Sequence, residues 1–350
     1  MYNHTHGGNI VFSNKEKNYI DFSVNTNPFG CPDVVKKMWD SLIDKACLYP
    51  SIDAKGVSLF YEKRFGIDRQ NLVAGNGSIE ILYLIPSALN IKSVLLVEPS
   101  FYDYRYAFEI NGCKINSCFL NEENEFKFET DRCFLDKLNV SDCVVLANPN
   151  NPTARMIDRD VILNLAESFK DKIFIIDEAF GMFLENYDDI TLAKSGLDNI
   201  IVLHSLTKIY ALAGLRIGSA IGNQRLIDKI KERKPPWSVN ALAEEIAIKL
   251  SECGDYERKT LKFLSEEKKR IMALIKQSKI IKLFDSDANF FLAKFINKEG
   301  FDDFLKYLWD KNIYVRDCRN FNGLNGNFFR FAVLKREYND RLINAILEYF

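Results

Sequence analysis

The sequence has very few histidines and almost no net charge. Only His4, His6 and His204 occur among 350 residues, and 47 basic side chains nearly balance 48 acidic ones. A zinc site would have to use His4 and His6 without an evident third ligand, so we expect no metal. A near-neutral chain also lacks the basic footprint of a nucleic-acid binder. Any general base is therefore expected to be a residue other than histidine.

Long apolar runs and paired cysteines are missing too. No stretch approaches the roughly 20 uninterrupted apolar residues of a membrane-spanning helix. The first eight residues lack the basic and apolar regions of a signal peptide. The eight cysteines are scattered without a C-x-x-C pair, which is typical of reduced thiols. We therefore expect a cytoplasmic protein with neither a membrane nor a nucleic acid as partner.

What the chain does contain is an alternation of strand-like and helix-like segments. With 47% apolar and 27% charged residues it has the composition of an ordinary globular protein, and its length allows two or three structural units. Short apolar runs rich in β-branched residues alternate with segments long enough for helices. This pattern predicts an α/β fold with a largely parallel sheet. The runs span residues 93–98, 143–148, 172–177, 199–204 and 216–221.

The pattern changes after Pro235-Pro236-Trp237. Residues 241–277 are charged and helical in period, which predicts one long connecting helix. A compact α+β unit follows, with strands at 289–295, 313–316 and 328–333 and a helix at 301–311. We expect an N-terminal segment, residues 1–30, that joins the small domain. Residues 31–240 form the large domain, and residues 241–350 supply the connecting helix and the small domain.

Lys208 lies between an apolar strand and an apolar helical stretch. An isolated lysine is usually a surface residue whose stem covers apolar groups. A lysine held in apolar surroundings can instead have a lowered pKa and attack a carbonyl as an amine. Ser205 and Arg216 flank it with groups that bind anions. This combination fits a cofactor that carries an aldehyde and a phosphate, namely pyridoxal 5′-phosphate.

Three further elements lie near predicted strand ends. Asp177 ends an apolar strand, where aspartate is a common turn residue but could also hold the cofactor's pyridine nitrogen protonated. Asn151 lies in a rigid loop with two prolines and could donate to the cofactor's O3′. Gly75-Asn76-Gly77-Ser78 precedes a predicted helix at 78–90 and offers backbone N–H groups to a phosphate. Alone, this glycine motif is weak evidence.

Together, in a fixed order along the chain, the four elements resemble the fold-type I pyridoxal-phosphate enzymes of the aspartate aminotransferase superfamily. Within it the chain is similar to the histidinol-phosphate aminotransferase branch and to the threonine-phosphate decarboxylases of cobalamin biosynthesis. The matching segments are His6-Gly7-Gly8-Asn9, Asp21-Phe22-Ser23-Val24-Asn25-Thr26-Asn27-Pro28, Asp177-Glu178-Ala179-Phe180, Pro236-Trp237-Ser238-Val239-Asn240-Ala241-Leu242-Ala243, Arg316-Asp317-Cys318 and Phe321-Asn322-Gly323-Leu324.

The resemblance implies roles around the cofactor. Lys208 would be the Schiff-base lysine and general acid/base, and Asp177 the partner of the pyridinium nitrogen. Asn151 would contact O3′, and Phe101 would stack on the ring. The resemblance also implies an obligate homodimer with shared active sites, because Tyr49 matches a tyrosine that reaches the neighbouring subunit's cofactor phosphate. The phosphate-binding set within one chain is Gly77, Ser78, Ile79, Ser205 and Arg216.

The resemblance likewise implies the substrate contacts. Arg330 matches the arginine that grips an α-carboxylate with both nitrogens. Arg316 matches a second arginine that faces a substrate phosphate, with His6 and Asn25 as helpers. Most aminotransferases of the superfamily have tyrosine at the position of Phe180, whereas the decarboxylases share the phenylalanine.

We therefore expect decarboxylation of a small O-phospho-L-amino acid. O-phosphothreonine would give aminopropanol phosphate, and O-phosphoserine would give ethanolamine phosphate. The alternative is an aminotransferase that acts on a small phosphorylated substrate, because both reactions use the same residues. An inactive relative would be expected to lose Lys208 or Asp177, and both are present.

Overall fold

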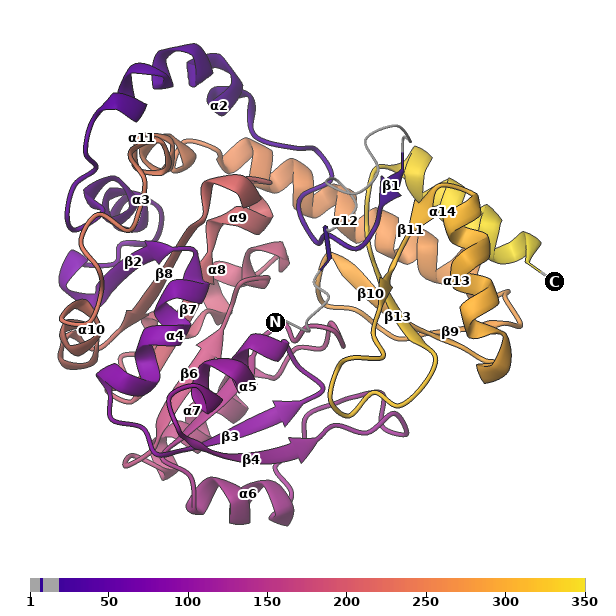
Figure 1. The fold of residues 1–350 in the computed structure, drawn as a ribbon, viewed down its shortest axis with the longest axis horizontal. Coiled ribbons are helices and arrows are strands. Elements are labelled where there is room, and N and C mark those ends of the chain that lie inside the picture. The colour runs from indigo at the N-terminus through magenta and orange to yellow at the C-terminus, as the bar shows by residue number, and fades with distance from the viewer. Residues whose placement is uncertain (1–6, 9–18, 350) are drawn as a thin grey trace.

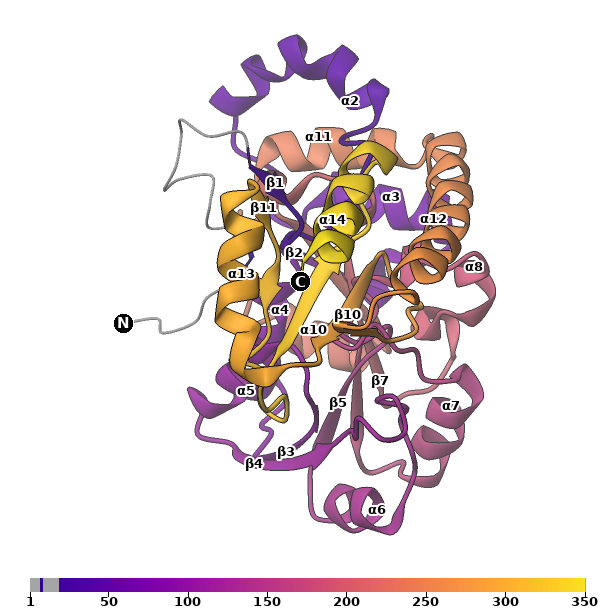
Figure 2. The same cartoon turned by 90° about the vertical axis from the view of Figure 1, so that its right-hand side faces the viewer.

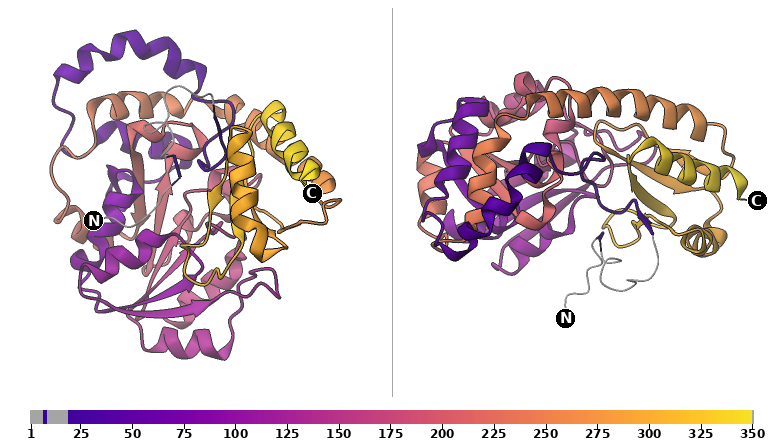
Figure 3. Two further views of the ribbon diagram at one scale, coloured as in Figure 1. Left: turned by 45° about the vertical axis from the view of Figure 1, so that its right-hand side comes forward. Right: turned by 90° about the horizontal axis from the view of Figure 1, so that it is seen from above.

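The protein consists of a large and a small lobe joined by a long helix. The computed structural model describes residues 7–8 and 19–349. We call residues 33–250 the large lobe, and residues 276–349 with residues 19–21 the small lobe. Helix α12 (Gly254–Ile275) runs from one lobe to the other (Figure 3). Within the described residues, no helix is both long and apolar enough to cross a membrane.

The large lobe is built on a seven-stranded sheet with helices on both faces (Figure 1). All neighbouring strands are parallel except β8, which is antiparallel to both of its neighbours. The prediction of an α/β fold with a mostly parallel sheet is therefore confirmed. In spatial order the strands are β2 (Leu72–Asn76), β8 (Ile217–Gly222), β7 (Ile200–Ser205), β6 (Ile173–Asp177), β5 (Cys143–Ala147), β3 (Ser93–Glu98) and β4 (Lys114–Phe119).

Burial on both faces explains the continuous apolar runs of the central strands. In β3, Val94 and Leu96 pack against helices on one face, and Leu95 and Val97 pack against helices on the other. The first face is covered by α4 (Ser78–Ala88), α5 (Tyr102–Glu109) and α10 (Gln224–Lys231), and the second by α6 (Arg132–Asn139) and α7 (Arg159–Ser168).

The remaining helices of the large lobe lie beside the β2 edge or follow strand ends. Helix α3 (Lys55–Phe65) packs on α11 (Ala241–Leu250), and the segment from α2 (Asp33–Met38) through residue 54 arches over them (Figure 1). Two short helices, α8 (Tyr187–Ile190) and α9 (Leu206–Ile209), follow β6 and β7.

The small lobe is an antiparallel sheet covered by two helices (Figure 2). Its strands lie in the order β12 (Arg316–Asp317), β13 (Phe328–Ala332), β10 (Phe290–Phe295) and β9 (Ile281–Leu283), and its helices are α13 (Phe301–Asp310) and α14 (Arg336–Glu348). A separate parallel pair joins β1 (Ile20–Asp21) to β11 (Ile313–Tyr314), so residues near the N-terminus lie beside the C-terminal part of the chain.

Two predictions about this half of the chain are wrong in detail. The single helix expected at 241–277 is two helices, α11 and α12, because the chain turns at residues 251–253. Each of the two helices buries one face, so both stretches are helical in period, and only Gly254 in the sequence marks the break between them. The single strand expected at 313–316 is two short strands that belong to different sheets.

Candidate active site

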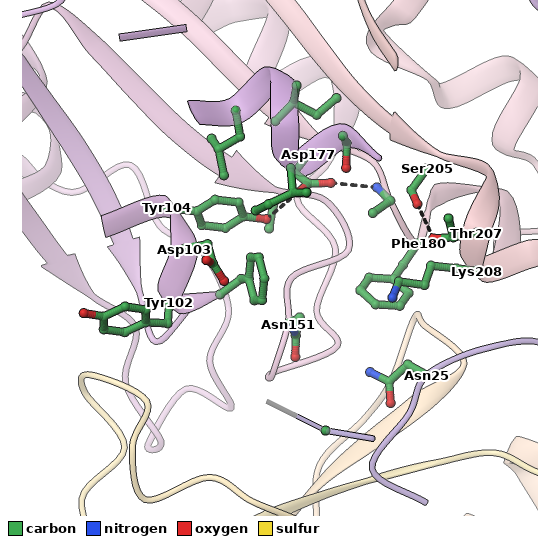
Figure 4. A pocket seen from close by; sticks show the side chains of 18 of the residues that line it. Asn25, Tyr102, Asp103, Tyr104, Asn151, Asp177, Phe180, Ser205, Thr207 and Lys208 are labelled. Carbon is green, nitrogen blue, oxygen red and sulfur yellow. Dashed lines mark hydrogen bonds between the residues drawn. The ribbon is translucent and has the colours of Figure 1, made fainter. Parts of the chain in front are cut away.

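A cavity of about 440 Å³ lies between the carboxyl ends of the parallel strands and the small lobe (Figure 4). Open α/β sheets bind their ligands at this edge. The cavity wall brings together residues from both ends of the sequence, from Gly7 to Arg330. The predicted site residues that line it are Asn25, Ser78, Ile79, Phe101, Asn151, Asp177, Ser205, Lys208, Arg216, Arg316 and Arg330.

Lys208 faces the cavity from α9, directly after β7. None of the described residues forms a hydrogen bond or an ion pair with its Nζ atom. Burial, and after it the guanidinium groups of Arg216 and Arg330, lower the pKa of Lys208 to about 8, and Asp177 partly opposes this shift. The amine is therefore far more available for reaction near neutral pH than an ordinary lysine.

Asp177 ends β6 and is held in one orientation by two donors. The hydroxyl of Tyr104 donates to Oδ2 at 2.7 Å, and the backbone N–H of Ala179 donates to Oδ1 at 2.9 Å (Figure 4). Burial raises the pKa of Asp177, and these two hydrogen bonds and Lys208 counteract it. A buried carboxylate with this support is suited to bind a protonated ring nitrogen.

The turn from β2 into α4 forms the end of the cavity that is suited to a phosphate. Gly77 has a φ of 76°, its N–H donates to the carbonyl of Arg216 at 2.8 Å, and a Cβ there would lie 2.6 Å from Nη2 of Arg216. Ser78 and Ile79 begin the helix, so their N–H groups have no partner within it. These donors and the Arg216 guanidinium together make a site for an anion.

Arg330 is fixed in the cavity wall by neutral oxygen atoms. Its Nη2 donates to the carbonyl of Ser23 at 2.7 Å, and its Nη1 donates to Oδ1 of Asn151. The carboxamide oxygen of Asn25, oriented to satisfy its neighbours, accepts from Nε at 3.3 Å and from Nη1 at 3.2 Å. The ring of Phe290 lies 5.3 Å from the guanidinium carbon. These contacts orient the guanidinium without neutralising its charge.

Arg316 is the cross-strand neighbour of Arg330 and is oriented in a similar way. Its Nη2 donates to Oδ1 of Asn320 at 2.8 Å, and its Nη1 donates to the carbonyl of Asp317. The guanidinium carbon lies 5.1 Å from the centre of the Phe321 ring. Both arginines are buried, with 6–7% of each residue exposed. Burial, and then Arg316, lower the pKa of Arg330.

The cavity therefore has an excess of positive charge. None of Arg216, Arg316 and Arg330 forms an ion pair with a carboxylate of the described residues. Buried charges are normally paired, because an unpaired charge loses its hydration without compensation. Such a cavity is suited to ligands that bring several negative charges with them.

Two predicted site residues of the described chain, Gly77 and Tyr49, do not line this cavity, and Gly77 lies directly before Ser78, which does. Tyr49 is 86% exposed on the segment between α2 and α3, and its ring lies 5.4 Å from the Trp237 ring. His6 lies outside the described residues, although Gly7 lines the cavity.

The cavity wall also contains residues that were not expected from the sequence, and Tyr104, Thr207 and Asn320 are the ones that support predicted site residues. Each acts through a neighbour, since Tyr104 holds Asp177, Asn320 holds Arg316, and the hydroxyl of Thr207 lies 2.7 Å from that of Ser205. One feature of the sequence could have indicated Tyr104. It follows Phe101, a predicted cofactor residue, by three positions, and Phe101 directly precedes the helix that contains Tyr104.

Comparison with known proteins agrees with this geometry. The sequence profile of the family described as aminotransferase class I and II matches residues 17–346. The chain is 30% identical over 358 residues to the threonine-phosphate decarboxylase of Salmonella typhimurium, covering 99% of this chain and 96% of the relative. It is 31% identical to an adenosylcobalamin biosynthesis bifunctional protein of Leptospira interrogans, and this match covers 99% of the chain but only 41% of that longer protein.

Among solved structures, the histidinol-phosphate aminotransferase of Clostridium acetobutylicum superimposes with a TM-score of 0.84 at 27% identity. This superposition covers 93% of the present chain and 97% of that one.

Proposed function

Because the chain belongs to the aminotransferase class I and II family, whose enzymes depend on pyridoxal 5′-phosphate, we propose that it decarboxylates a small O-phospho-L-amino acid. The substrate would be O-phosphothreonine or O-phosphoserine, and the product aminopropanol phosphate or ethanolamine phosphate. The observation that carries this proposal is the pair of buried arginines, Arg316 and Arg330, on neighbouring strands of the small lobe.

The residues of the cavity fit the cofactor. Lys208 would hold its aldehyde carbon and Asp177 its ring nitrogen, with Phe101 against the ring and Asn151 near O3′. The close approach of Gly77 to Arg216 leaves space for a phosphate only because position 77 has no side chain. The phosphate ligands would be Gly77, Ser78, Ile79, Ser205 and Arg216. Bound pyridoxal phosphate supplies an electron sink that weakens the Cα bond perpendicular to its ring.

Two unpaired guanidiniums on opposed residues of an antiparallel pair suit one small molecule with two anionic groups. Arg330, which Ser23, Asn25 and Asn151 hold, would bind the α-carboxylate. Arg316 would bind the phosphate at the other end of the substrate. With both ends of the substrate held in this way, the bond from Cα to the carboxylate would lie perpendicular to the cofactor ring, and the Cα–H bond would not.

The bond that breaks joins Cα to the carboxylate carbon, which leaves as CO2. A proton would then replace it on Cα, and Lys208, which lines the cavity, would deliver that proton from its Nζ atom. Phe180 supports this assignment, because its ring packs edge-on against Phe290 and offers no hydroxyl to O3′. This decarboxylation needs neither an oxidant nor a second substrate.

The alternative is an aminotransferase that acts on a small phosphorylated substrate. The similarity to a solved histidinol-phosphate aminotransferase favours it, and the same arginines would serve. In that reaction the Cα–H bond would stand perpendicular to the cofactor ring, and Lys208 would remove the proton. A 2-oxo acid would be required to complete the cycle.

We also propose a homodimer with shared active sites. A group of large apolar side chains is exposed around the segment between α2 and α3, which is typical of a surface that another protein covers. Tyr49 belongs to this group and would reach the cofactor phosphate of the second subunit. The members of this exposed apolar patch are Trp39, Ile43, Leu48, Tyr49, Ile52 and Trp237.

Product analysis tests the proposal directly. The cofactor-loaded enzyme is mixed with O-phosphoserine or O-phosphothreonine, with and without a 2-oxo acid. CO2 and an aminoalcohol phosphate, formed without the acceptor, would establish the decarboxylase and rank the two substrates. Absence of CO2, together with bleaching of the cofactor band that a 2-oxo acid reverses, would establish the aminotransferase instead.

The two arginines should differ in their effects. Arg330→Ala should lower kcat/KM for every amino acid substrate by about 100-fold or more, because it removes a bidentate contact with the carboxylate. Arg316→Ala should raise KM for phosphorylated substrates while binding of the plain amino acid stays unchanged. Equal losses of affinity for O-phosphothreonine and threonine in Arg316→Ala would contradict the assignment of the phosphate to Arg316.

A further inference from the structure

The loop that joins β12 to β13 carries one end of the substrate site. Arg316 precedes it, and Asn320 and Phe321 within it line the cavity. Figure 1 shows this loop reaching from the small-lobe sheet towards β3 and β4 of the large lobe. The loop therefore crosses between the lobes, and its residue Asn320 holds the guanidinium of Arg316.

Glu98, at the end of β3, offers this loop a fixed acceptor. Its carboxylate is buried and accepts from Arg105 twice, from Nε at 3.3 Å and from Nη2 at 2.8 Å. Arg105 in turn donates to Ser117 of β4 at 2.9 Å. All three residues belong to the large lobe, so the carboxylate is held in place whether or not the loop is present.

Asn322 is the loop residue that forms a hydrogen bond with the Glu98 carboxylate. Its Nδ2 donates to Oε2 of Glu98 at 2.8 Å, and this is its one side-chain hydrogen bond with the described residues. The next residue, Gly323, has a φ of 89°, and a Cβ there would lie 2.7 Å from Cδ1 of Phe119. The loop backbone thus lies directly on the large lobe beside this hydrogen bond.

We infer that the hydrogen bond from Asn322 to Glu98 fastens the substrate-binding loop to the large lobe. Asn322 and Glu98 are thereby positioning residues for Arg316 and Asn320. This inference rests on the proposed function in one respect, namely that Arg316 binds the substrate phosphate. Because Asn320 donates nothing to Arg316 and only accepts from it, its own amide N–H group is free to face the same phosphate.

The predicted effect is confined to the phosphate end. Arg330 lies within β13 and is held by Ser23 and Asn151, none of which belongs to the loop. Release of the loop should therefore weaken recognition of the phosphate while recognition of the carboxylate is kept. A general loss of folding would instead weaken both.

The test compares Asn322→Ala with Asn325→Ala in the cofactor-loaded enzyme. Asn325 is exposed in the same loop and forms no side-chain hydrogen bond with any described residue. Affinities for O-phosphothreonine and L-threonine are measured from the change in cofactor absorbance. Asn322→Ala should weaken O-phosphothreonine binding about tenfold, as expected for a lost hydrogen bond to a charged group. L-threonine binding, and both affinities of Asn325→Ala, should stay within about twofold.

A charge placed at the same position gives a second test. Asn322→Asp places two carboxylates against each other and should weaken O-phosphothreonine binding more than Asn322→Ala does. Binding by Asn322→Asp as tight as that by the wild-type enzyme would overturn the inference.

Hydrogen–deuterium exchange separates this inference from the proposed function. Without any substrate, Asn322→Ala should speed exchange of the backbone amides in residues 317–327, and Asn325→Ala should not. If the wild-type enzyme binds neither phosphorylated amino acid, the proposed function fails, and faster exchange in Asn322→Ala alone would still establish the fastening. Unchanged exchange in Asn322→Ala would refute the fastening, whatever the substrate.

Discussion

Lys208 illustrates how one buried charge couples reactivity to stability. An ordinary lysine loses its proton near a pKa of 10.5, whereas that of Lys208 in the folded protein is about 8. Between these values the unfolded chain binds more protons than the folded chain, so stability should rise with pH. At pH 7 Lys208 of the cofactor-free protein is mostly protonated, and its charge beside Arg216 and Arg330 lowers the free energy of unfolding.

Lys208→Met should therefore raise the melting temperature of the cofactor-free protein at pH 7. The gain over wild type should shrink as pH increases from about 8 towards 10.5, since wild type loses the charge in this range. Thermal unfolding at pH 7 and at high pH measures both. Lys170→Met, at an exposed position, is the matched control and should show no such trend. A gain that stayed constant with pH would contradict the assigned cause.

Tyr104 acts on Asp177 through a hydrogen bond that lowers the pKa of this carboxyl. Tyr104→Phe removes the donor and keeps the ring, so the pKa of Asp177 should rise. The carboxylate should then lose its charge at higher pH, and the acidic limb of the pH–rate profile should move upward. We also expect kcat to fall about tenfold with little change in KM. An unshifted acidic limb would show that Tyr104 does not tune Asp177.

At the scale of single residues, the sequence identifies the charged groups of the site but not the polar residues that hold them in place. Lys208, Asp177 and the arginines are visible because charged residues at the ends of apolar runs need an explanation. Tyr104 and Asn320 are ordinary residues of a helix and a loop, and their meaning lies in the neighbour that each contacts. That neighbour is set by the fold, which a single sequence does not display.

At the scale of elements, the sequence predicts the buried central strands of the large sheet but not the two strands at its edges. The strand expected at 93–98 is observed as Ser93–Glu98, because residues 94–97 are apolar and are buried on both faces of the sheet. Strand β4 was not expected, since its residues are polar or half-exposed at the sheet edge. Strand β2 was not expected either, because its glycine suggested only a loop. Pairing with β8 overrides that local preference.

The crossing of α3 and α11 depends on Gly56. A Cβ at this position would lie 2.3 Å from the carbonyl oxygen of Glu244, and the N–H of Gly56 donates to the Glu244 carboxylate at 3.2 Å. Gly56→Ala should push the helices apart and lower the free energy of unfolding by about 1–3 kcal/mol. Urea denaturation measures the loss. Gly214→Ala is the control, because nothing lies within 4 Å of the Cβ that it would add.

At the scale of the whole molecule, one described chain leaves two features unexplained. The rest of the described chain leaves the exposed apolar patch uncovered, and Tyr49 within it is 86% exposed. Apart from Trp237, both features lie on the segment between α2 and α3, which arches away from the sheet (Figure 1). A second copy of the chain that covers this segment would account for both. Without the resemblance, composition and spacing give no indication of it.

Shared active sites make a prediction that separate sites do not. Lys208→Ala removes the reactive amine, and Tyr49→Ala would remove the phosphate contact that one subunit lends to the other. In a mixed dimer of the two variants, one site would contain both wild-type residues and the other site neither. Random mixing makes about half of the dimers mixed, so activity should recover to about one quarter of wild type. Subunit exchange followed by an activity assay measures it.

The control for this recovery is Ile43→Asp, which places a charge on the exposed apolar patch and should keep the subunits apart. Added to both variants, it should abolish the recovery and reduce the molecular mass in solution to that of one chain. If each site were instead completed within its own chain, Tyr49→Ala would damage only the subunit that carries it. Mixing would then yield no more than the sum of the two variants measured apart.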